Sequence, residues 1–311
     1  MEFSHVSVLL PETIDSLQIK PDGIYVDCTA GGGGHSKAIL EKLTTGHLIA
    51  IDRDPDAITV LKERLGAYPN AHIVHDSFDH IKTILDGHKV DGIIADLGVS
   101  SYQLDNRERG FSFHADAPLD MRMSKEGLSA KDVVNTYSEP QLAKILWDYG
   151  EEKFSKSIAR NIVKARAEKP IETTFELIDI VRASMPQKVL RESGHPARKT
   201  FQAIRIEVNE ELTELDTALD DMFSCLKIGG ILSIITFHSL EDRMVKQRFQ
   251  SFLEGCTCPE EFPVCVCGKT PCGKLVGKKK GIAPSDAECE ENKRARSARL
   301  RSIQKIKEKD A

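Results

Sequence analysis

Four consecutive glycines, Gly31–Gly34, limit what this chain can fold into more than any other feature. They stand between a short apolar run, residues 23–28, and a segment from His35 to Leu43 with helical periodicity. Glycine has no Cβ, so the backbone can turn tightly there and a ligand can approach it closely. The N-terminus of the following helix adds unpaired N–H groups and a positive dipole end. The pattern predicts a strand, a turn and a helix with a ligand at the turn; a turn that binds nothing is the weaker alternative.

The same alternation continues through the first hundred residues. Apolar runs at 47–52, 71–75 and 90–95 predict strands, and residues 55–65 predict a helix. Short, continuous apolar strands that alternate with helices are typical of a parallel sheet covered on both faces. We therefore predict an α/β fold with a mostly parallel, Rossmann-like sheet.

A helical segment interrupts this pattern. Between residues 104 and 207 no strand signal appears, and helix starts are indicated at Ser129, Ser138 and Thr173. A length of 311 residues is enough for about two domains. The predicted domains are residues 1–103 together with 208–311, and the inserted all-helical residues 104–207.

The sheet pattern resumes after the insertion. Residues 208–226 have the periodicity of a long amphipathic helix that stops at Gly229-Gly230. Residues 231–237 predict a buried strand, Ser239 has the form of the N-cap of another helix, and residues 298–306 predict a final strand.

Composition excludes several classes of protein. With 40% hydrophobic and 29% charged residues, disorder along the whole chain is excluded. The longest apolar stretch, residues 228–237, is far shorter than the ~18–20 residues of a membrane span. The first residues lack the basic leader and apolar core of a secretion signal, so we expect a cytoplasmic protein with reduced cysteines and no membrane partner.

Charge is unevenly distributed along the chain. The net charge is −5, yet residues 269–309 hold 13 Lys and Arg against 5 Asp and Glu, a local charge of +8. Residues 104–207 hold 18 against 16, a local charge of +2. An acidic body with a basic C-terminal tail indicates contact with a polyanion, and a solvated tail is the alternative.

Acidic residues at predicted strand ends indicate the ligand. Asp52 ends the second strand, 21 residues after Gly31, where a carboxylate can accept both hydroxyls of a ribose. An adenosine-containing cofactor fits, and a dinucleotide remains open because Gly31-x-Gly33-x-x-Ser36 approaches that fingerprint. Asp27 favours S-adenosylmethionine, because a carboxylate there can reach, directly or through water, the ammonium group of a methionine moiety, which NAD lacks. Phe78 follows the third strand in a loop suited to contact adenine.

Asp96 ends the fourth strand, in Asp96-Leu97-Gly98-Val99-Ser100-Ser101. Ligands of open α/β sheets bind beside the carboxyl ends of the strands, so Asp96 is a candidate to contact a substrate. A cap or turn role is equally open on this evidence.

The chain resembles the bacterial 16S ribosomal RNA N4-cytosine methyltransferase family. The matching stretches run in order from residue 5 to about residue 300. They are His5–Leu10, Gly31–Ser36, Ala50–Asp54, Asp96–Ser101 with Gln103-Leu104-Asp105, Arg109–Phe113, Pro118–Met123, Tyr149–Glu152, His195–Ala197, Thr200–Ile206, Phe237–Arg243 and Arg294–Ser297.

This resemblance implies a class I methyltransferase fold with a helical insertion, S-adenosylmethionine as cofactor, and N4-methylcytidine in the decoding centre (P site) of 16S ribosomal RNA as product. The partner would be 16S RNA within the small ribosomal subunit, with no obligate protein partner. The implied cofactor contacts are Gly33, Gly34, His35, Asp52, Phe78, Asp96 and Gln103. Most amino-methyltransferases have Asp, Asn or Ser, two prolines and then an aromatic residue after the fourth strand, whereas this chain has Asp96-Leu97-Gly98-Val99.

For the reaction, we predict Asp96 and His238 as catalytic residues. Asp96, or the Leu97 carbonyl, would accept the hydrogens of the target amine, and His238 would stack on the extruded base. Phe111, Phe113 and Phe237 are further stacking candidates, with core packing as the favoured alternative. The predicted phosphate contacts are Arg107, Arg109, Arg122, Arg198, Lys199 and the basic tail from Lys278 to Arg301.

Five cysteines between Cys256 and Cys272 suggest zinc, but their Cys-x-Cys spacing departs from the usual knuckle. We predict no metal site, and we expect Cys28 and Cys225 in the core. Three other functions stay open: an RNA-binding ribosome-assembly factor that binds the cofactor without turnover, an amino-methyltransferase for DNA or a small molecule, and, more distantly, a nicotinamide oxidoreductase.

Overall fold

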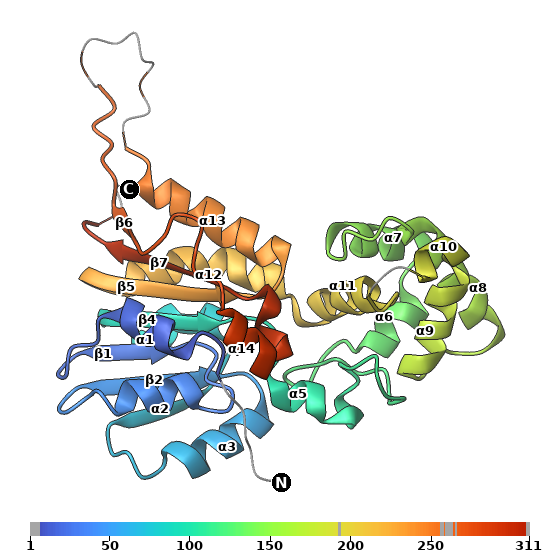
Figure 1. Ribbon diagram of the computed structural model, residues 1–311, viewed down its shortest axis with the longest axis horizontal. Coiled ribbons are helices and arrows are strands. Elements are labelled where there is room, and N and C mark those ends of the chain that lie inside the picture. The colour runs from blue at the N-terminus through green and yellow to red at the C-terminus, as the bar shows by residue number, and fades with distance from the viewer. Residues whose placement is uncertain (1–6, 192–193, 256–257, 259–263, 265, 309–311) are drawn as a thin grey trace. The chain divides into compact units, whose positions relative to one another are not determined.

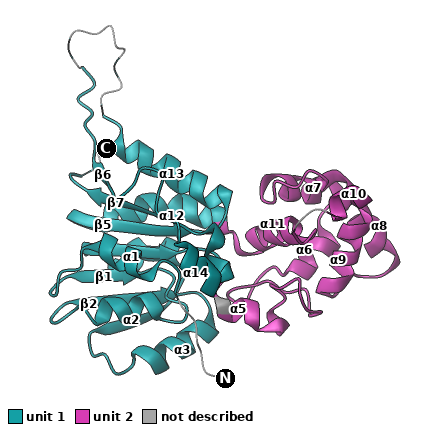
Figure 2. Cartoon of the chain, in the orientation of Figure 1, with its two compact units in different colours: residues 1–98, 212–311 teal, residues 99–211 magenta. Residues whose placement is uncertain are grey.

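The protein is described by a computed structural model that covers residues 7–191, 194–255, 258, 264 and 266–308. It divides into two compact units, residues 1–98 with 212–311 and residues 99–211 (Figure 2). The sequence placed the boundaries a few residues inside the second unit, at 104 and 207. No helix in the described part of the chain combines the length and the apolar character that crossing a membrane requires.

A seven-stranded sheet forms the centre of the first unit (Figure 1). Its order is β3-β2-β1-β4-β5-β7-β6, and the first five of these strands run parallel. β7 is antiparallel to both of its neighbours. The strands are β1 (Ile24–Asp27), β2 (His47–Asp52), β3 (Ala71–His75), β4 (Val90–Asp96), β5 (Leu226–Thr236), β6 (Gly273–Val276) and β7 (Arg299–Lys305). The predicted α/β, mostly parallel sheet is confirmed.

Helices cover both faces of this sheet. Apolar side chains alternate along the strands, so that Tyr25 packs into one core and Val26 into the other. The first core is shared with α1, α2 and α3, and the second with α4, α12 and α13. The helices of this unit are α1 (Leu10–Leu17), α2 (Gly34–Leu40), α3 (Pro55–Leu65), α4 (Ile81–Leu85), α12 (Glu211–Cys225), α13 (Ser239–Leu253) and α14 (Asp286–Glu291). Cys28 and Cys225 lie in the second core, as expected.

The second unit is helical and has its own core, to which Leu142, Ile158 and Ile204 belong. The predicted helix starts at Ser129, Ser138 and Thr173 are confirmed, because each side chain accepts a hydrogen bond from the backbone N–H three residues ahead. Its helices are α5 (Ser101–Asp105), α6 (Ala130–Thr136), α7 (Glu139–Asp148), α8 (Ser155–Glu168), α9 (Thr174–Ala183), α10 (Gln187–Leu190) and α11 (Arg198–Asn209).

Two predictions for the second half of the chain are wrong, and one strand is missing from them. The helix predicted over 208–226 is divided at Glu210, whose φ of 51° is left-handed, and it ends at Cys225. Leu226 already pairs with Val90, and Gly229 with Gly230 lies where the register of β5 shifts. The short strand β6 was not predicted.

The predicted final strand, residues 298–306, is confirmed as β7, and because β7 lies inside the sheet between β5 and β6 this part of the basic stretch is not a tail. The ammonium group of Lys305 is buried and donates to the carbonyls of Ser224 and Leu226 at 3.1 and 3.0 Å. This positive charge therefore holds the end of α12 against β7.

Candidate active site

The order of the sheet defines where a ligand binds. β1 lies between β2 and β4, so the chain crosses in opposite directions on the two sides of β1. Open α/β sheets bind ligands at such a reversal, outside the carboxyl ends of the strands. Asp27, Asp52 and Asp96 are the last residues of β1, β2 and β4. The structure thus brings the three predicted carboxylates to one edge of the sheet.

The glycine turn is held in a conformation that favours glycine. Gly33 has a φ of +76° and forms the N-cap of α2, and a Cβ there would lie 3.1 Å from the Leu61 side chain. A Cβ on Gly34 would overlap the Ser7 hydroxyl. The Arg64 guanidinium donates to the Gly32 carbonyl. The turn therefore presents a fixed backbone surface. At Gly33 and Gly34 only glycine avoids a close contact between a Cβ and the neighbouring side chains.

Asp52 joins the turn to the end of β2. Its Oδ2 accepts a hydrogen bond from the Gly31 N–H at 2.7 Å, and its Oδ1 accepts one from the Asp54 N–H at 2.8 Å. Burial raises the pKa of Asp52 to about 6. Each carboxylate oxygen can accept a second hydrogen bond, so the group still suits ribose hydroxyls.

Asp27 lies beneath the turn and is only 1% exposed. Its oxygens accept hydrogen bonds from the Ser36 hydroxyl at 2.7 Å and from the Thr29 N–H at 3.2 Å. Burial raises its pKa to about 6. The carboxylate therefore supports the turn through Ser36, and its contact with an ammonium group, directly or through water, stays a prediction.

Asp96 differs from the other two carboxylates because one of its oxygens is unpaired. Its backbone N–H donates to the Thr29 hydroxyl at 2.6 Å, and its Oδ2 lies 3.7 Å from the His35 Nδ1. The other oxygen, Oδ1, is buried with no hydrogen-bond partner in the described chain. Burial, followed by the nearby Asp27 and Glu241 carboxylates, raises the pKa of Asp96 well above its usual range. A buried polar atom without a partner indicates a group that a ligand or substrate completes.

His35 supports this arrangement from α2. The imidazole is buried, and its Nε2 lies 3.1 Å from the Val8 carbonyl. His35 thus lies between the N-terminal segment and Asp96, and the ring nitrogen nearer the carboxylate is Nδ1.

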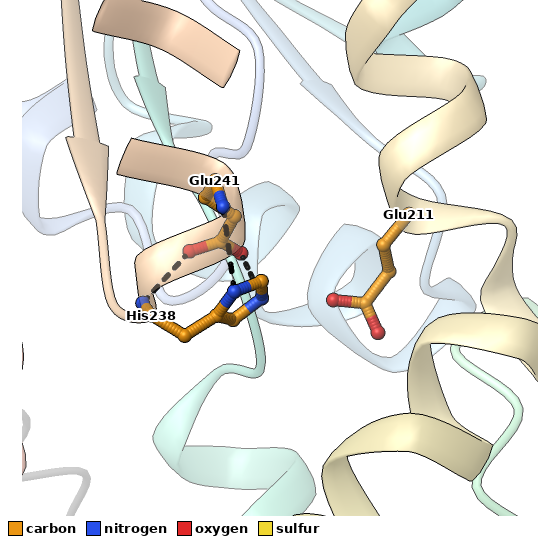
Figure 3. Close-up of side chains that lie close together, drawn as sticks. All are labelled: Glu211, His238 and Glu241. Carbon is orange, nitrogen blue, oxygen red and sulfur yellow. Dashed lines mark hydrogen bonds and ion pairs between the residues drawn. The ribbon is translucent and has the colours of Figure 1, made fainter. Parts of the chain in front are cut away.

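His238 has a structural role that the sequence did not indicate. It is the N-cap of α13, and its Nδ1 accepts from the Glu241 N–H at 3.4 Å. Its Nε2 lies 3.0 Å from the Glu241 carboxylate, and Figure 3 shows the imidazole turned toward that group. Glu241 also accepts from the N–H groups of Phe237 and His238. His238 therefore replaces Ser239 as the cap, and its catalytic and stacking roles stay predictions.

Phe78 and Gln103 belong to different units. Phe78 begins a short 3₁₀ turn, residues 78–80, and is partly buried against the core. Gln103 lies in the helical unit, where its side chain accepts from the Ser100 N–H at 2.9 Å and closes a capping box.

Several residues predicted to contact RNA have partners within the helical unit. Arg109 is 6% exposed, and its guanidinium donates to the carbonyls of Arg122 and Met123 at 2.8 and 2.9 Å. Phe111 is buried in the helical core. Arg109 is therefore not available to a phosphate, which corrects that prediction, and Phe111 packs in the core, which is the alternative that the sequence favoured.

The other candidates in this unit are more accessible. Phe113 is partly buried and stacks on His195, with ring centroids 4.5 Å apart. Arg122 is paired with Asp120 at 2.6 Å. Lys199 is exposed although its ammonium donates to the Glu151 carbonyl at 2.9 Å, and Arg107 and Arg198 are exposed.

The cysteine cluster is described only in part. Cys256 and Cys265 lie outside the described residues. Cys272 is buried in the core, and its thiol donates to the Phe252 carbonyl.

Comparison with known proteins assigns the family. The sequence pattern of the MraW methylase family matches residues 2–306. The chain belongs to this family. It is 60% identical, over 98% of its length and 100% of the relative's, to the ribosomal RNA small subunit methyltransferase H of Clostridium botulinum (strain Kyoto / Type A2). It is 54% identical, over 98% of its length and 99% of the relative's, to the protein of the same name from Lachnospira eligens.

Similarity to solved structures is weaker, and the assignment does not depend on it. A putative methyltransferase from Streptococcus mutans in complex with SAH has a TM-score of 0.44 and 13% identity, over 97% of this chain and 99% of that chain.

As a member of the MraW methylase family, the chain has the class I methyltransferase fold and takes S-adenosylmethionine as cofactor. The described residues fit this cofactor, since a fixed glycine turn, a ribose-type carboxylate and the unpaired Asp96 oxygen lie at one sheet edge. The supporting residues Thr29, Ser36 and Glu241 were not singled out from the sequence. Ser36 alone had a signal, as the last residue of the glycine motif.

Proposed function

We propose that this methyltransferase transfers a methyl group from S-adenosylmethionine to the exocyclic N4 of a cytidine in the decoding centre (P site) of 16S ribosomal RNA, in the small subunit and hence in the cytoplasm. The names of the relatives that share 54–60% of its residues support a ribosomal RNA substrate. The observation that carries the proposal is the unpaired oxygen of Asp96, because it can accept a hydrogen bond from an amine that receives the methyl group.

The cofactor would lie along the carboxyl edge of β1, β2 and β4. We assign Gly33, Gly34 and His35 to its amino-acid part and Asp52 to its ribose. Phe78 would contact the adenine, and Gln103 is retained as a contact from the helical unit. When bound, S-adenosylmethionine supplies a methyl group on a positively charged sulfur.

Asp96 would accept a hydrogen bond from the N4 amine at Oδ1. The lone pair of that amine is delocalised into the cytosine ring, and an acceptor on its hydrogens favours the pyramidal, nucleophilic form. The proton that nitrogen loses after transfer would pass to the same oxygen. Burial raises the pKa of the Asp96 carboxyl group, so this group holds a proton more readily than an ordinary aspartate does.

Positioning would supply much of the remaining acceleration, with the reacting atoms held about 3–3.5 Å apart and in line. The target base must leave its stack to reach Asp96. Phe237 follows β5, is partly buried, and lies next to Gly98 of the Asp96 loop, so it is our candidate to stack on that base. Arg107, Arg122, Arg198 and Lys199 would hold RNA phosphates, with the helical unit acting in substrate recognition.

The test is incubation with radiolabelled S-adenosylmethionine and small subunits that lack the modification, followed by nucleoside analysis of the RNA. We expect label in N4-methylcytidine, and a loss of about 10²–10⁴-fold in rate for Asp96→Asn at saturating cofactor.

Asp91→Asn is the matched control, because Asp91 lies near the other end of β4 and pairs with Lys20 and Lys227. It should lower stability and leave the rate per folded molecule unchanged. Label in another nucleoside would refute the N4-cytidine assignment. Binding of subunits without label would favour an assembly factor, and an unchanged rate for Asp96→Asn would exclude the mechanism.

A further inference from the structure

Three consecutive lysines, Lys278–Lys280, follow β6 and form an exposed turn. The Gly281 N–H donates to the Lys278 carbonyl at 2.8 Å and closes the turn. Gly277 and Gly281, at its two ends, have φ values of +81° and +76°. We call these residues, 277–281, the lysine turn.

Two arginines of β7 hold the backbone of the lysine turn. Arg299 donates to the Lys280 carbonyl at 2.6 Å, and Arg301 donates to the Lys279 carbonyl at 3.1 Å. Arg301 is itself paired with both oxygens of Asp242 in α13, at 2.8 and 3.0 Å. The turn is therefore fixed to the methyltransferase unit by its own backbone.

The ammonium groups of the three lysines, in contrast, make no contact of this kind in the described part of the chain. All three side chains are exposed, and within the described part of the chain none has a hydrogen-bond or ion-pair partner. Three uncompensated positive charges on a fixed turn form a local site for anions, whereas the next helix, α14, is acidic.

The sheet register places the lysine turn at the same edge as Asp96. Asp96 pairs with Ile235, Ile235 with Leu300, and Leu300 with Ile282, the residue directly after the turn. Three strand spacings of about 4.8 Å separate Asp96 from Ile282, a distance of about 15 Å. A nucleic acid strand whose target base lies at Asp96 can thus reach the turn with its neighbouring phosphates.

We infer that the lysine turn is a second contact surface for the RNA, which binds phosphates of nucleotides near the target. This inference rests on the proposed function for the identity of the RNA. Arg299 and Arg301 act as positioning residues for the turn, and Lys278–Lys280 make the contacts.

The test compares the triple variant Lys278→Gln, Lys279→Gln, Lys280→Gln with the wild type. Binding to unmodified small subunits and to naked 16S RNA is measured at several salt concentrations, with S-adenosylhomocysteine present to prevent turnover. We expect affinity for both to fall about tenfold or more at low salt, and the salt slope to fall by about 2, since each phosphate contact to a single strand contributes about 0.7.

The matched control is Lys37→Gln, Lys42→Gln, Lys62→Gln, which removes the same charge from exposed positions elsewhere in this unit. It should change affinity less than about twofold, because scattered charges act only through weak, screened fields. Unfolding temperature and cofactor affinity should stay at the wild-type values in both variants.

An unchanged salt slope, or an equal loss in the control, would overturn the inference. Weaker binding to subunits with unchanged binding to naked RNA would also overturn it and would indicate an acidic protein partner. If the wild type labels no cytidine while the lysine variant still loses RNA affinity, the proposed function fails and the lysine turn stands.

Discussion

Two regions of the molecule contain polar residues that the sequence predicted to contact a ligand. One is the glycine turn of the methyltransferase unit with its nearby carboxylates, and the other is the set of basic residues in the helical unit. In the first region, Asp52 and Asp96 lie at the sheet edge where a ligand is expected. In the second, Arg109 is buried and holds the loop at residues 122–123, and Arg122 is paired with Asp120. Position in the fold therefore indicates which polar groups stay available to a ligand better than residue type does.

The difference has a physical cause. Carboxylates at the ends of parallel strands are brought together by the sheet itself, whatever their side chains do. An arginine in a loop has five donors and a long side chain, and nearby carbonyls can use them before a ligand arrives. Whether such a charge is available depends on partners that local sequence does not reveal.

The largest expected effect concerns Arg109. We expect Arg109→Ala to destabilise the helical unit by about 2–4 kcal/mol, because two carbonyls lose their donor inside a packed loop. Arg198→Ala, at an exposed position, should change stability by less than about 0.5 kcal/mol and weaken RNA binding instead. Thermal unfolding and hydrogen exchange of residues 99–211 measure the first effect. If Arg109→Ala and Arg198→Ala weaken RNA binding equally and leave stability unchanged, Arg109 binds RNA after all.

An intermediate effect is expected in the glycine turn. Gly33→Ala and Gly87→Ala both place a Cβ on a left-handed residue, with φ of +76° and +81°, which costs about 1–2 kcal/mol each. Only Gly33 has neighbours within contact distance of that Cβ. Calorimetry should show S-adenosylmethionine binding weakened about tenfold by Gly33→Ala and unchanged by Gly87→Ala. Equal affinities of the two variants for S-adenosylmethionine would show that Gly33 does not contribute to the cofactor site.

The smallest effect is a pH dependence caused by Asp27. Its pKa of about 6 lies above the 3.8 of an ordinary aspartate, so the folded state holds more protons between these values. The stability that Asp27 contributes is full below about pH 4 and is lost as the pH rises through about 6. Between about pH 5 and pH 7.5 the unfolding temperature should fall by a few degrees more in the wild type than in Asp27→Asn. Parallel pH curves for the two proteins would contradict this account of the buried carboxylate.

Much of the methyltransferase unit could be predicted locally. The strands 47–52 and 71–75 and the helix 55–65 have the predicted bounds, because Gly, Pro and Asn residues delimit runs with a single clear periodicity. β6 escaped prediction because it is a four-residue edge strand that contains a glycine and a lysine. The start of α13 was misplaced by one residue because histidine is an uncommon cap, and a serine with the usual signature follows it.

What the sequence by itself determined is the alternation of strands and helices, the glycine turn and the acidic residues at strand ends, since each depends on neighbours a few positions away. Only the tertiary structure decided which charges remain available. Arg301 is bound by Asp242, 59 residues away, and Lys305 by the end of α12, whereas Lys278–Lys280 have no partner in the described chain. These contacts join segments that only folding brings together. Composition therefore showed one basic stretch, whereas the fold divides it into residues that hold the structure, such as Arg301 and Lys305, and a proposed binding surface at Lys278–Lys280.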